Sequence, residues 1–246
     1  MGVQIVSNGW ASHPALWNHN SRDRLAAIDL RVGRLFALVG EGLASATAAF
    51  LEGDREAARA VAAADPVIDD LYQEAEELVH EQLTRDGHIS GAELLRLISV
   101  LRIAPELERS GDLVEHIALR ASQNLGAVLN PRCRGLIQRM SDIGIELWHA
   151  AADAYHDNDI TAAERLRQRD DDLDALHVEL TAELAAGETS LAVAIEMGLV
   201  GRFYERLGDH AVNVARRVMP PRAPAPPQLE FEGSRCTSAR YIPPAA

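Results

Sequence analysis

The chain carries two copies of one helical unit, and this internal repeat limits its fold more than any other feature. The spacing Asp65-x-x-x-Asp69 recurs 105 residues later as Asp170-x-x-x-Asp174. Farther along, the segment 107–112, Leu-Glu-Arg-Ser-Gly-Asp, recurs after 97 residues as 204–209, Tyr-Glu-Arg-Leu-Gly-Asp. Two copies of a three-helix unit, with eight residues fewer in the second connection, explain both offsets.

Hydrophobic residues recur at three- and four-residue steps through most of each copy, which is the period of an amphipathic helix. Aromatic residues make up only 4% of the chain, a composition that favours helices over a β-sandwich. Turn signals divide the pattern into six helices at about 24–52, 54–85, 90–125, 132–155, 159–185 and 190–218. We therefore predict an all-α fold of two tandem three-helix bundles with six antiparallel helices.

The same signals predict four regions along the chain. Residues 1–21 carry no helical period and are expected to form a loosely ordered arm. The first repeat should span 22–128 and the second 129–218. From 219 to 246 the chain is rich in proline, which cannot continue a helix, so we expect a flexible tail.

Charge and cysteine content exclude several classes of protein. There are 37 acidic residues against 24 basic ones, for a formal net charge of −13, whereas nucleic-acid binders usually present a basic surface. No apolar run approaches the roughly 18 residues that span a bilayer, and no secretory signal is visible. Two cysteines cannot form a disulfide framework, so we expect a cytoplasmic protein.

The repeated carboxylates are expected to face one another across each helical hairpin. The residue numbers of Asp65 and Asp112 have the midpoint 88.5, and those of Asp69 and Glu108 have the same midpoint. This midpoint falls in the turn already predicted near residues 87–90. In the second copy, the pairs Asp170/Asp209 and Asp174/Glu205 share the midpoint 189.5, again within a predicted turn. Residues four apart stand on one helix face, so each hairpin should present four carboxylates at one level.

Four carboxylates at one level repel one another by roughly 4 kcal/mol per pair at about 4 Å, and protons or cations must relieve that repulsion. Oxygen-rich sites suit hard or intermediate cations such as iron, manganese, magnesium or calcium, and bridging carboxylates can hold more than one ion. His116 lies four residues beyond Asp112 and could extend the first set. The alternative is that each pair is a solvated helix edge.

At these residues the sequence resembles the PhoU family, bacterial regulators of phosphate uptake built from two three-helix repeats. The resemblance covers about residues 22–218. Its most specific stretches are 108–112 and 205–213, which look like the family's two E-R-x-G-D segments, the second continuing as D-H-A-V-N. The paired aspartates match the acidic motif that the family carries on the preceding helix. The first copy departs from the pattern with Leu113 and His116 in place of His210 and Asn213.

The resemblance implies one multinuclear metal cluster per repeat, with iron as the first choice and manganese, magnesium or zinc as alternatives. The implied ligands are Asp65, Asp69, Glu108, Asp112, Asp170, Asp174, Glu205 and Asp209. It further implies an adaptor without chemistry of its own. Such an adaptor would act between a PstB-like phosphate-transporter ATPase and a PhoR-like sensor histidine kinase, as a negative regulator of phosphate-starvation genes. Homodimers are common in the family.

Two other functions compete with this one. A di-iron carboxylate oxidoreductase needs Glu-x-x-His pairs inside a helical bundle, and Glu77-x-x-His80 and Glu146-x-x-His149 fit that short pattern. A purely structural helical dimer with solvated acidic edges is the other alternative. No serine or cysteine nucleophile stands in a recognisable setting and no glycine-rich phosphate loop follows a strand, so we do not expect an enzyme.

Overall fold

The computed structural model describes residues 14–85, 89–186 and 189–218 of the 246-residue chain. Within these ranges the chain forms helices and short connections, without a strand. The elements in order are α1 (Pro14–Glu52), α2 (Arg55–Ala62), α3 (Asp65–Thr84), α4 (Gly91–Ser122), the short 3-10 helix η1 (Leu125–Val128), α5 (Pro131–Asp157), α6 (Ala162–Ala185) and α7 (Leu191–Arg217). The all-α prediction is confirmed.

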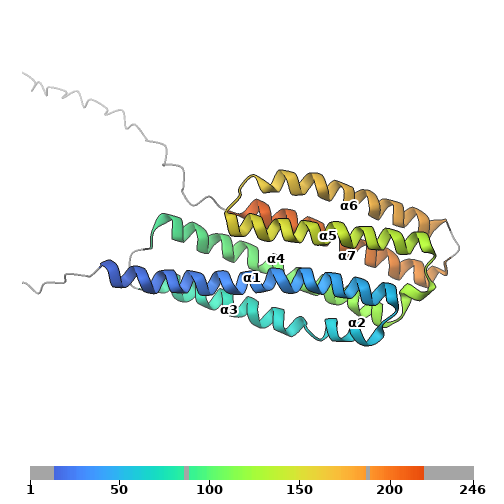
Figure 1. Cartoon of the computed structure of the whole chain (residues 1–246), viewed down its shortest axis with the longest axis horizontal. Helices are drawn as coiled ribbons and strands as arrows, with labels where there is room; N and C mark the ends of the chain where they lie inside the picture. Colours follow the sequence, from blue (N-terminus) through green and yellow to red (C-terminus); the bar gives the residue numbers. More distant parts are fainter. Residues whose placement is uncertain (1–13, 86–88, 187–188, 219–246) are drawn as a thin grey trace, which may run out of the picture.

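The two predicted repeats form two three-helix bundles that share one core (Figure 1). In the first bundle α3 packs against α1 and α4, and in the second α6 packs against α5 and α7. The bundles meet because α1 packs on α5 and α4 packs on α7, so these four helices form the centre. As a result α3, together with α2, and α6 lie on opposite edges of the molecule.

Aromatic and hydroxyl groups join the two bundles in the core. The ring of Phe36 on α1 lies 6.1 Å from that of Trp148 and 5.7 Å from that of Tyr155, both on α5. Thr47 and Tyr204 are both buried, and their hydroxyl oxygens lie 2.6 Å apart across the interface between α1 and α7. Buried hydroxyls need such partners, so this pair helps to fix the register between the repeats.

Side-chain caps begin several helices where the sequence places turn signals. The hydroxyl of Ser90 accepts from the amide of Glu93 at 3.2 Å, and Ser190 accepts from Val193 at 3.4 Å. The carboxylate of Asp54 accepts hydrogen bonds from two backbone amides at the start of α2. These bonds satisfy backbone N–H groups that have no partner within the helix.

The predicted helix over 54–85 is wrong in one respect, because it is divided at Ala63–Ala64 into α2 and α3. Pro66 stands in the first turn of α3. In an uninterrupted helix its ring would press against the carbonyl of Ala62 and its missing N–H would leave that carbonyl unpaired. The second repeat has Asp171 at the equivalent position, and α6 runs unbroken through it.

The prediction of a loosely ordered arm over 1–21 is also wrong in part, because α1 already begins at Pro14. The prediction relied on hydrophobic periodicity, which is absent before Arg24. Once a helix has nucleated, each added residue gains one backbone hydrogen bond without a new nucleation cost, so it can extend past its amphipathic part. Residues 1–13 and the predicted tail over 219–246 lie outside the described residues.

One helical segment, Asp23–Glu52, is long and apolar enough to cross a membrane by length and composition, which the sequence analysis did not anticipate. Half of its apolar window is buried inside the protein. Val32, Leu35, Val39 and Leu43 in this segment are fully buried in the shared core. The central position of α1 therefore accounts for its apolar character.

Candidate metal centre

In the second repeat the four predicted carboxylates come together along the line where α6 packs against α7. Burial, followed by the negative charges of Asp174 and Asp209, raises the pKa of Asp170 to about 7. The charge of Glu205 acts on Asp170 in the same direction. Asp170 therefore lies within electrostatic range of the other three carboxylates, as the common midpoint predicts.

Asp170 is the most enclosed of these carboxylates. Its side chain is 8% exposed, and its Oδ1 atom is buried without a hydrogen-bond partner. A Cβ atom added to Gly208 on α7 would lie 2.2 Å from this oxygen. The glycine of the repeated motif thus leaves the space that the carboxylate occupies. A buried carboxylate oxygen without a partner is costly, and a bound proton or cation would relieve that cost.

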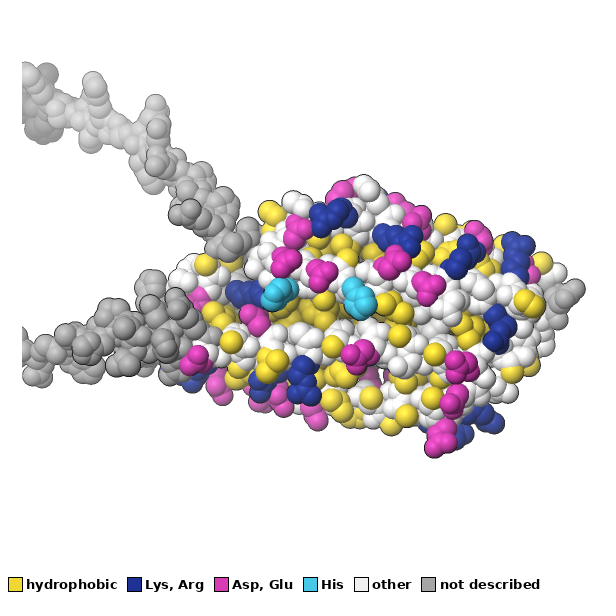
Figure 2. All heavy atoms as spheres, viewed as in Figure 1, with side chains coloured by type: hydrophobic (Ala, Val, Ile, Leu, Met, Phe, Trp, Pro, Cys, Tyr) yellow, Lys and Arg dark blue, Asp and Glu magenta, His cyan; other side chains and the backbone are white. Residues whose placement is uncertain are grey.

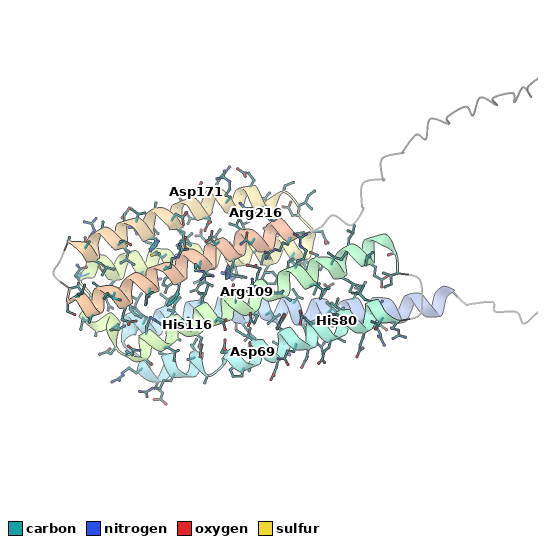
Figure 3. All side chains as sticks on the ribbon, turned by 180° about the vertical axis from the view of Figure 1, so that it is seen from behind. Asp69, His80, Arg109, His116, Asp171 and Arg216 are labelled. Carbon is teal, nitrogen blue, oxygen red and sulfur yellow. The ribbon has the colours of Figure 1, made fainter. Side chains whose placement is uncertain are left out.

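The first repeat brings its four carboxylates together between α3 and α4, in a more open setting. Burial, followed by the charges of Glu115 and Asp69, raises the pKa of Asp65 to about 6. Asp112 adds to this effect. Burial and then the charges of Asp112 and Asp69 also raise the pKa of Glu108. Figure 3 labels Asp69 on α3 and Arg109 and His116 on α4.

The arginines near the two acidic faces form ion pairs with different kinds of partner. Arg202 forms an ion pair with Glu205 from one turn earlier on α7, while the other oxygen of Glu205, Oε2, is buried without a hydrogen-bond partner. Arg109 belongs to the repeated motif, yet it pairs at 3.1 Å with Glu106 and not with a predicted ligand. Arg202 is a partner of the acidic face that the sequence analysis missed.

A buried polar network separates the two acidic faces where α4 packs on α7. Glu106 is 4% exposed and forms an ion pair with Arg217, near the end of α7. Ser110 Oγ lies 3.0 Å from Nδ1 of His210, whose other ring nitrogen is 3.9 Å from Glu106. His210, the histidine of the D-H-A-V-N stretch, therefore serves the interface between repeats.

Two further residues border the acidic faces. His177 on α6 lies one turn beyond Asp174, and burial followed by the charge of Arg202 lowers its pKa. In the first repeat His116 is exposed, and its ring lies 5.4 Å from that of Phe203. The sequence carried a signal for His177 in the spacing Asp174-x-x-His177, which the sequence analysis did not use.

A pocket of about 300 Å³ opens beside the first face, at the break between α2 and α3. Asp65 lines it together with Glu41 and Glu115. Its other lining residues are small or apolar: Leu38, Gly42, Ser45, Ala60, Val61, Ala64, Ile68, Gly111 and Val114. In the second repeat, Leu147 stands at the position equivalent to Gly42 and is 1% exposed.

The carboxylates suit a cation by donor chemistry but are not arranged around one. Within the part of the chain that the structure describes, no three His, Cys, Asp or Glu side chains are grouped so as to hold a metal ion. However, all eight predicted ligands are hard oxygen donors, and Asp170 and Glu205 each keep a buried oxygen without a hydrogen bond. By donor chemistry these residues fit a hard or intermediate cation.

The competing di-iron site is contradicted by burial. Glu77 and His80 on α3 and Glu146 and His149 on α5 are all exposed, and Glu146 pairs with Arg169. Figure 2 shows the side with α1 and α5 in front, where acidic and basic side chains are interspersed. A di-iron bundle site needs these side chains to project inward, so the motif pairs do not form one.

Comparisons with known proteins agree with the fold and with the duplicated motifs. The PhoU domain matches residues 32–121 and 137–218. PhoU homolog 2 of Mycobacterium tuberculosis, a phosphate-specific transport system accessory protein, is 30% identical over 200 residues, covering 80% of this chain and 93% of the relative. Homolog 1 of the same organism is 33% identical over 199 residues, covering 80% and 90%.

Solved structures support the fold alone. PhoU from Pseudomonas aeruginosa superimposes with a TM-score of 0.70 at 24% identity, covering 81% of this chain and 94% of the other. PhoU from Streptococcus pneumoniae gives a TM-score of 0.72 at 20% identity, covering 80% and 94%. The duplicated helical unit, the acidic motifs and the matched domains lead to one conclusion: the chain belongs to the PhoU family.

Proposed function

We propose that this protein is a non-enzymatic accessory regulator of a phosphate-specific transport system. Family membership supports this role, since the curated relatives in Mycobacterium tuberculosis are accessory proteins of such systems. The structure offers two acidic faces and a shared core, whereas the residue pairs that an oxidoreductase would need are exposed.

The function depends on metal binding at the two acidic faces. The observation that carries this proposal is the buried Oδ1 of Asp170, which has no hydrogen-bond partner and lies among three further carboxylates. The first face supports it through the raised pKa of Asp65. We expect a multinuclear cluster on each repeat, with iron as the first choice and manganese, magnesium or zinc as alternatives.

The residues around each face would hold the cations in different ways. In the second repeat Asp170 and Asp174 on α6 and Glu205 and Asp209 on α7 would bind from opposite sides, with Glu205 leaving Arg202. In the first repeat Asp65 and Asp69 would oppose Glu108 and Asp112. Bound cations would supply positive charge that offsets the repulsion between the carboxylates of neighbouring helices.

The proposed partners are a PstB-like transporter ATPase and a PhoR-like sensor histidine kinase, with this protein acting between them as a cytoplasmic negative regulator. The transporter would change its contacts with the repeats, and the kinase would detect this as a population shift. We also propose that the protein is a homodimer, which light scattering of the purified full-length chain would test.

Elemental analysis of protein purified without chelators or a histidine tag tests the metal proposal. Several metal equivalents are expected in the parent, and few in the double variant Asp112→Ala/Asp209→Ala. The matched control is Asp142→Ala/Asp153→Ala, which removes two exposed carboxylates of α5 and should retain the parent's metal. A metal-free parent that is fully folded by circular dichroism would contradict the proposal.

A genetic experiment tests the regulatory role separately from metal content. Deleting the gene should derepress phosphate-starvation promoters in phosphate-rich medium, and the parent gene should restore repression. If promoter activity is unchanged by the deletion, the negative regulatory role is wrong even where the protein binds metal.

A further inference from the structure

His177 lies on the acidic face of the second repeat, although it is outside the repeated motifs. It follows Asp174 by three residues and Asp170 by seven on α6. This spacing places all three side chains along one helix face. A carboxylate followed three residues later by histidine is also the helical pair used by carboxylate-bridged metal sites in helical bundles.

The imidazole lies where α6 packs against α7. A Cβ atom added to Gly201 on α7 would be 3.0 Å from Cδ2 of His177 and 3.7 Å from its Nε2. The absent side chain of Gly201 thus makes room for the ring. His177 is half-buried, and no hydrogen bond within the described part of the chain involves its ring nitrogens. The charges of Asp174 and Arg202 both act on it.

The carboxylates of all three pairs with this spacing are exposed, and burial distinguishes only His177 from the other two histidines. Glu77 and His80, like Glu146 and His149, are exposed on outer faces. His177 instead is half-buried and lies one turn beyond Asp174, which itself follows the 8% exposed Asp170 by one turn. A half-buried ring nitrogen with no hydrogen bond therefore stands at the end of the acidic face, next to Asp174.

The first repeat has no such nitrogen at the equivalent place. Tyr72 replaces His177 and Ala104 replaces Gly201. His116 borders the first face from α4, but it is exposed and its ring contacts Phe203. The two faces therefore differ in donor chemistry as well as in burial.

We propose that His177 is a metal ligand of the second repeat, giving this centre a mixed nitrogen and oxygen donor set. Imidazole favours borderline transition metals, whereas carboxylates alone suit magnesium, calcium and manganese. The second centre should therefore prefer Fe²⁺, Co²⁺ or Zn²⁺ over Mg²⁺ and Ca²⁺. This inference rests on the proposed metal centre of the second repeat.

Pulsed EPR of bound Mn²⁺ tests this directly, because it detects a nitrogen nucleus coordinated to the ion. The full-length chain carries Asp65→Ala/Asp112→Ala to leave only the second centre, is stripped with chelator and is loaded with Mn²⁺. We expect nitrogen coupling in this background, its loss in His177→Gln and its retention in His149→Gln, a change at an exposed histidine of α5. Zn²⁺ affinity should fall about tenfold or more in His177→Gln, with Mg²⁺ affinity nearly unchanged.

The outcomes separate this inference from the proposed function. Bound Mn²⁺ without nitrogen coupling, or with coupling that persists in His177→Gln, would overturn the role of His177 while leaving the carboxylate centre intact. Failure of the folded background protein to bind any Mn²⁺ would overturn both the second centre and this inference. Circular dichroism of each variant establishes that it is folded.

Discussion

The acidic faces of the two repeats share a pattern of carboxylates, but they differ in how far the surrounding protein encloses them. In the second repeat α6 is continuous and Asp170 is nearly inaccessible to solvent. In the first, the break at Ala63–Ala64, just before Pro66, divides the matching helix, and Asp65 borders an open pocket. Duplication thus preserved the spacing of the charges while a few neighbouring residues changed their environment.

Three substitutions between the repeats account for the difference. Pro66 stands where the second repeat has Asp171, Gly42 where it has Leu147, and Glu115 where it has Val212. The first breaks the helix, the second removes the side chain that would fill the space, and the third adds a carboxylate to the pocket lining. Exchanging or removing these features should alter the two environments unequally.

The largest effect on stability is expected at Leu147, which fills the space in the second repeat that Gly42 leaves open in the first. Leu147→Ala should lower the free energy of unfolding by about 2–5 kcal/mol, because it removes a buried side chain and leaves a cavity. Urea unfolding measures this change. Gly42→Ala is the matched variant in the first repeat; its added Cβ would lie 3.0 Å from Val114, so we expect a change within about 1 kcal/mol. Equal effects would contradict the claim that Leu147 fills the space left open by Gly42.

The second largest effect is expected from introducing the helix-breaking proline into the second repeat. Asp171→Pro should destabilise the protein by about 3 kcal/mol and reduce helical circular dichroism, because proline in the middle of α6 removes a hydrogen bond and clashes with the preceding turn. Pro66→Ala should change stability by about 1 kcal/mol or less, since the break already accommodates that position. If Asp171→Pro is tolerated as well as Pro66→Ala, the break does not depend on proline.

The motif glycines should also respond unequally. In Gly208→Ala the new Cβ would meet Asp170 Oδ1 at 2.2 Å, so we expect a loss of about 1–3 kcal/mol in urea unfolding. In Gly111→Ala the new Cβ would meet two methyl groups of Ile68, at 2.8 and 3.0 Å, so we expect a smaller loss. Alanine's higher helix propensity offsets about 1 kcal/mol in both variants. A larger loss for Gly111→Ala would show that the first face is the more tightly packed one.

Over a single pH unit, the pH dependence of the metal-free protein gives the smallest effect, at most about 1.4 kcal/mol for each carboxyl. The folded pKa of Asp170, about 7, lies above the ordinary aspartate value of 3.8, so the folded state binds its proton more strongly. The contribution of Asp170 to the free energy of unfolding is present at low pH and is lost as the pH rises from about 4 through about 7. For Asp65 this loss is complete near pH 6.

Urea unfolding in chelator between pH 4 and 8 measures this loss. Asp170→Asn should remove the part of the fall in unfolding free energy with pH that extends above pH 6. Asp65→Asn should remove a part of this fall that ends near pH 6. The exposed Asp142→Asn serves as the control and should leave the slope unchanged. An unchanged slope in Asp170→Asn would mean that this carboxyl is not enclosed in solution.

Local chemistry made much of the fold predictable. Ser90 and Ser190 cap helices at the predicted positions because a hydroxyl satisfies the same free amides in any helix of this kind. The level pairing of Asp170 with Asp209 was predictable because two antiparallel helices advance by the same rise per residue. Pro66 was a visible signal of a break that the sequence analysis did not use.

Contacts between the repeats were not predictable in the same way. Glu106 was not singled out from the sequence and His210 was noted only as part of a motif, yet both are buried between α4 and α7. The pairs Glu77/His80 and Asp174/His177 have the same spacing, and only their positions in the bundle separate an exposed pair from one beside the acidic face. Helical periodicity describes one helix at a time and does not say which neighbour covers it.

The sequence by itself determined the duplication, the helical class, the helix starts and the registration of the carboxylates, since these depend on spacing along the chain and on backbone hydrogen bonding. The tertiary structure decided that Asp170 is enclosed while Asp65 borders a pocket, and that His177 is half-buried beside Asp174 while His80 is exposed. Burial and electrostatic environment depend on side chains that come from distant parts of the chain, and only the packing of the two repeats brings these together.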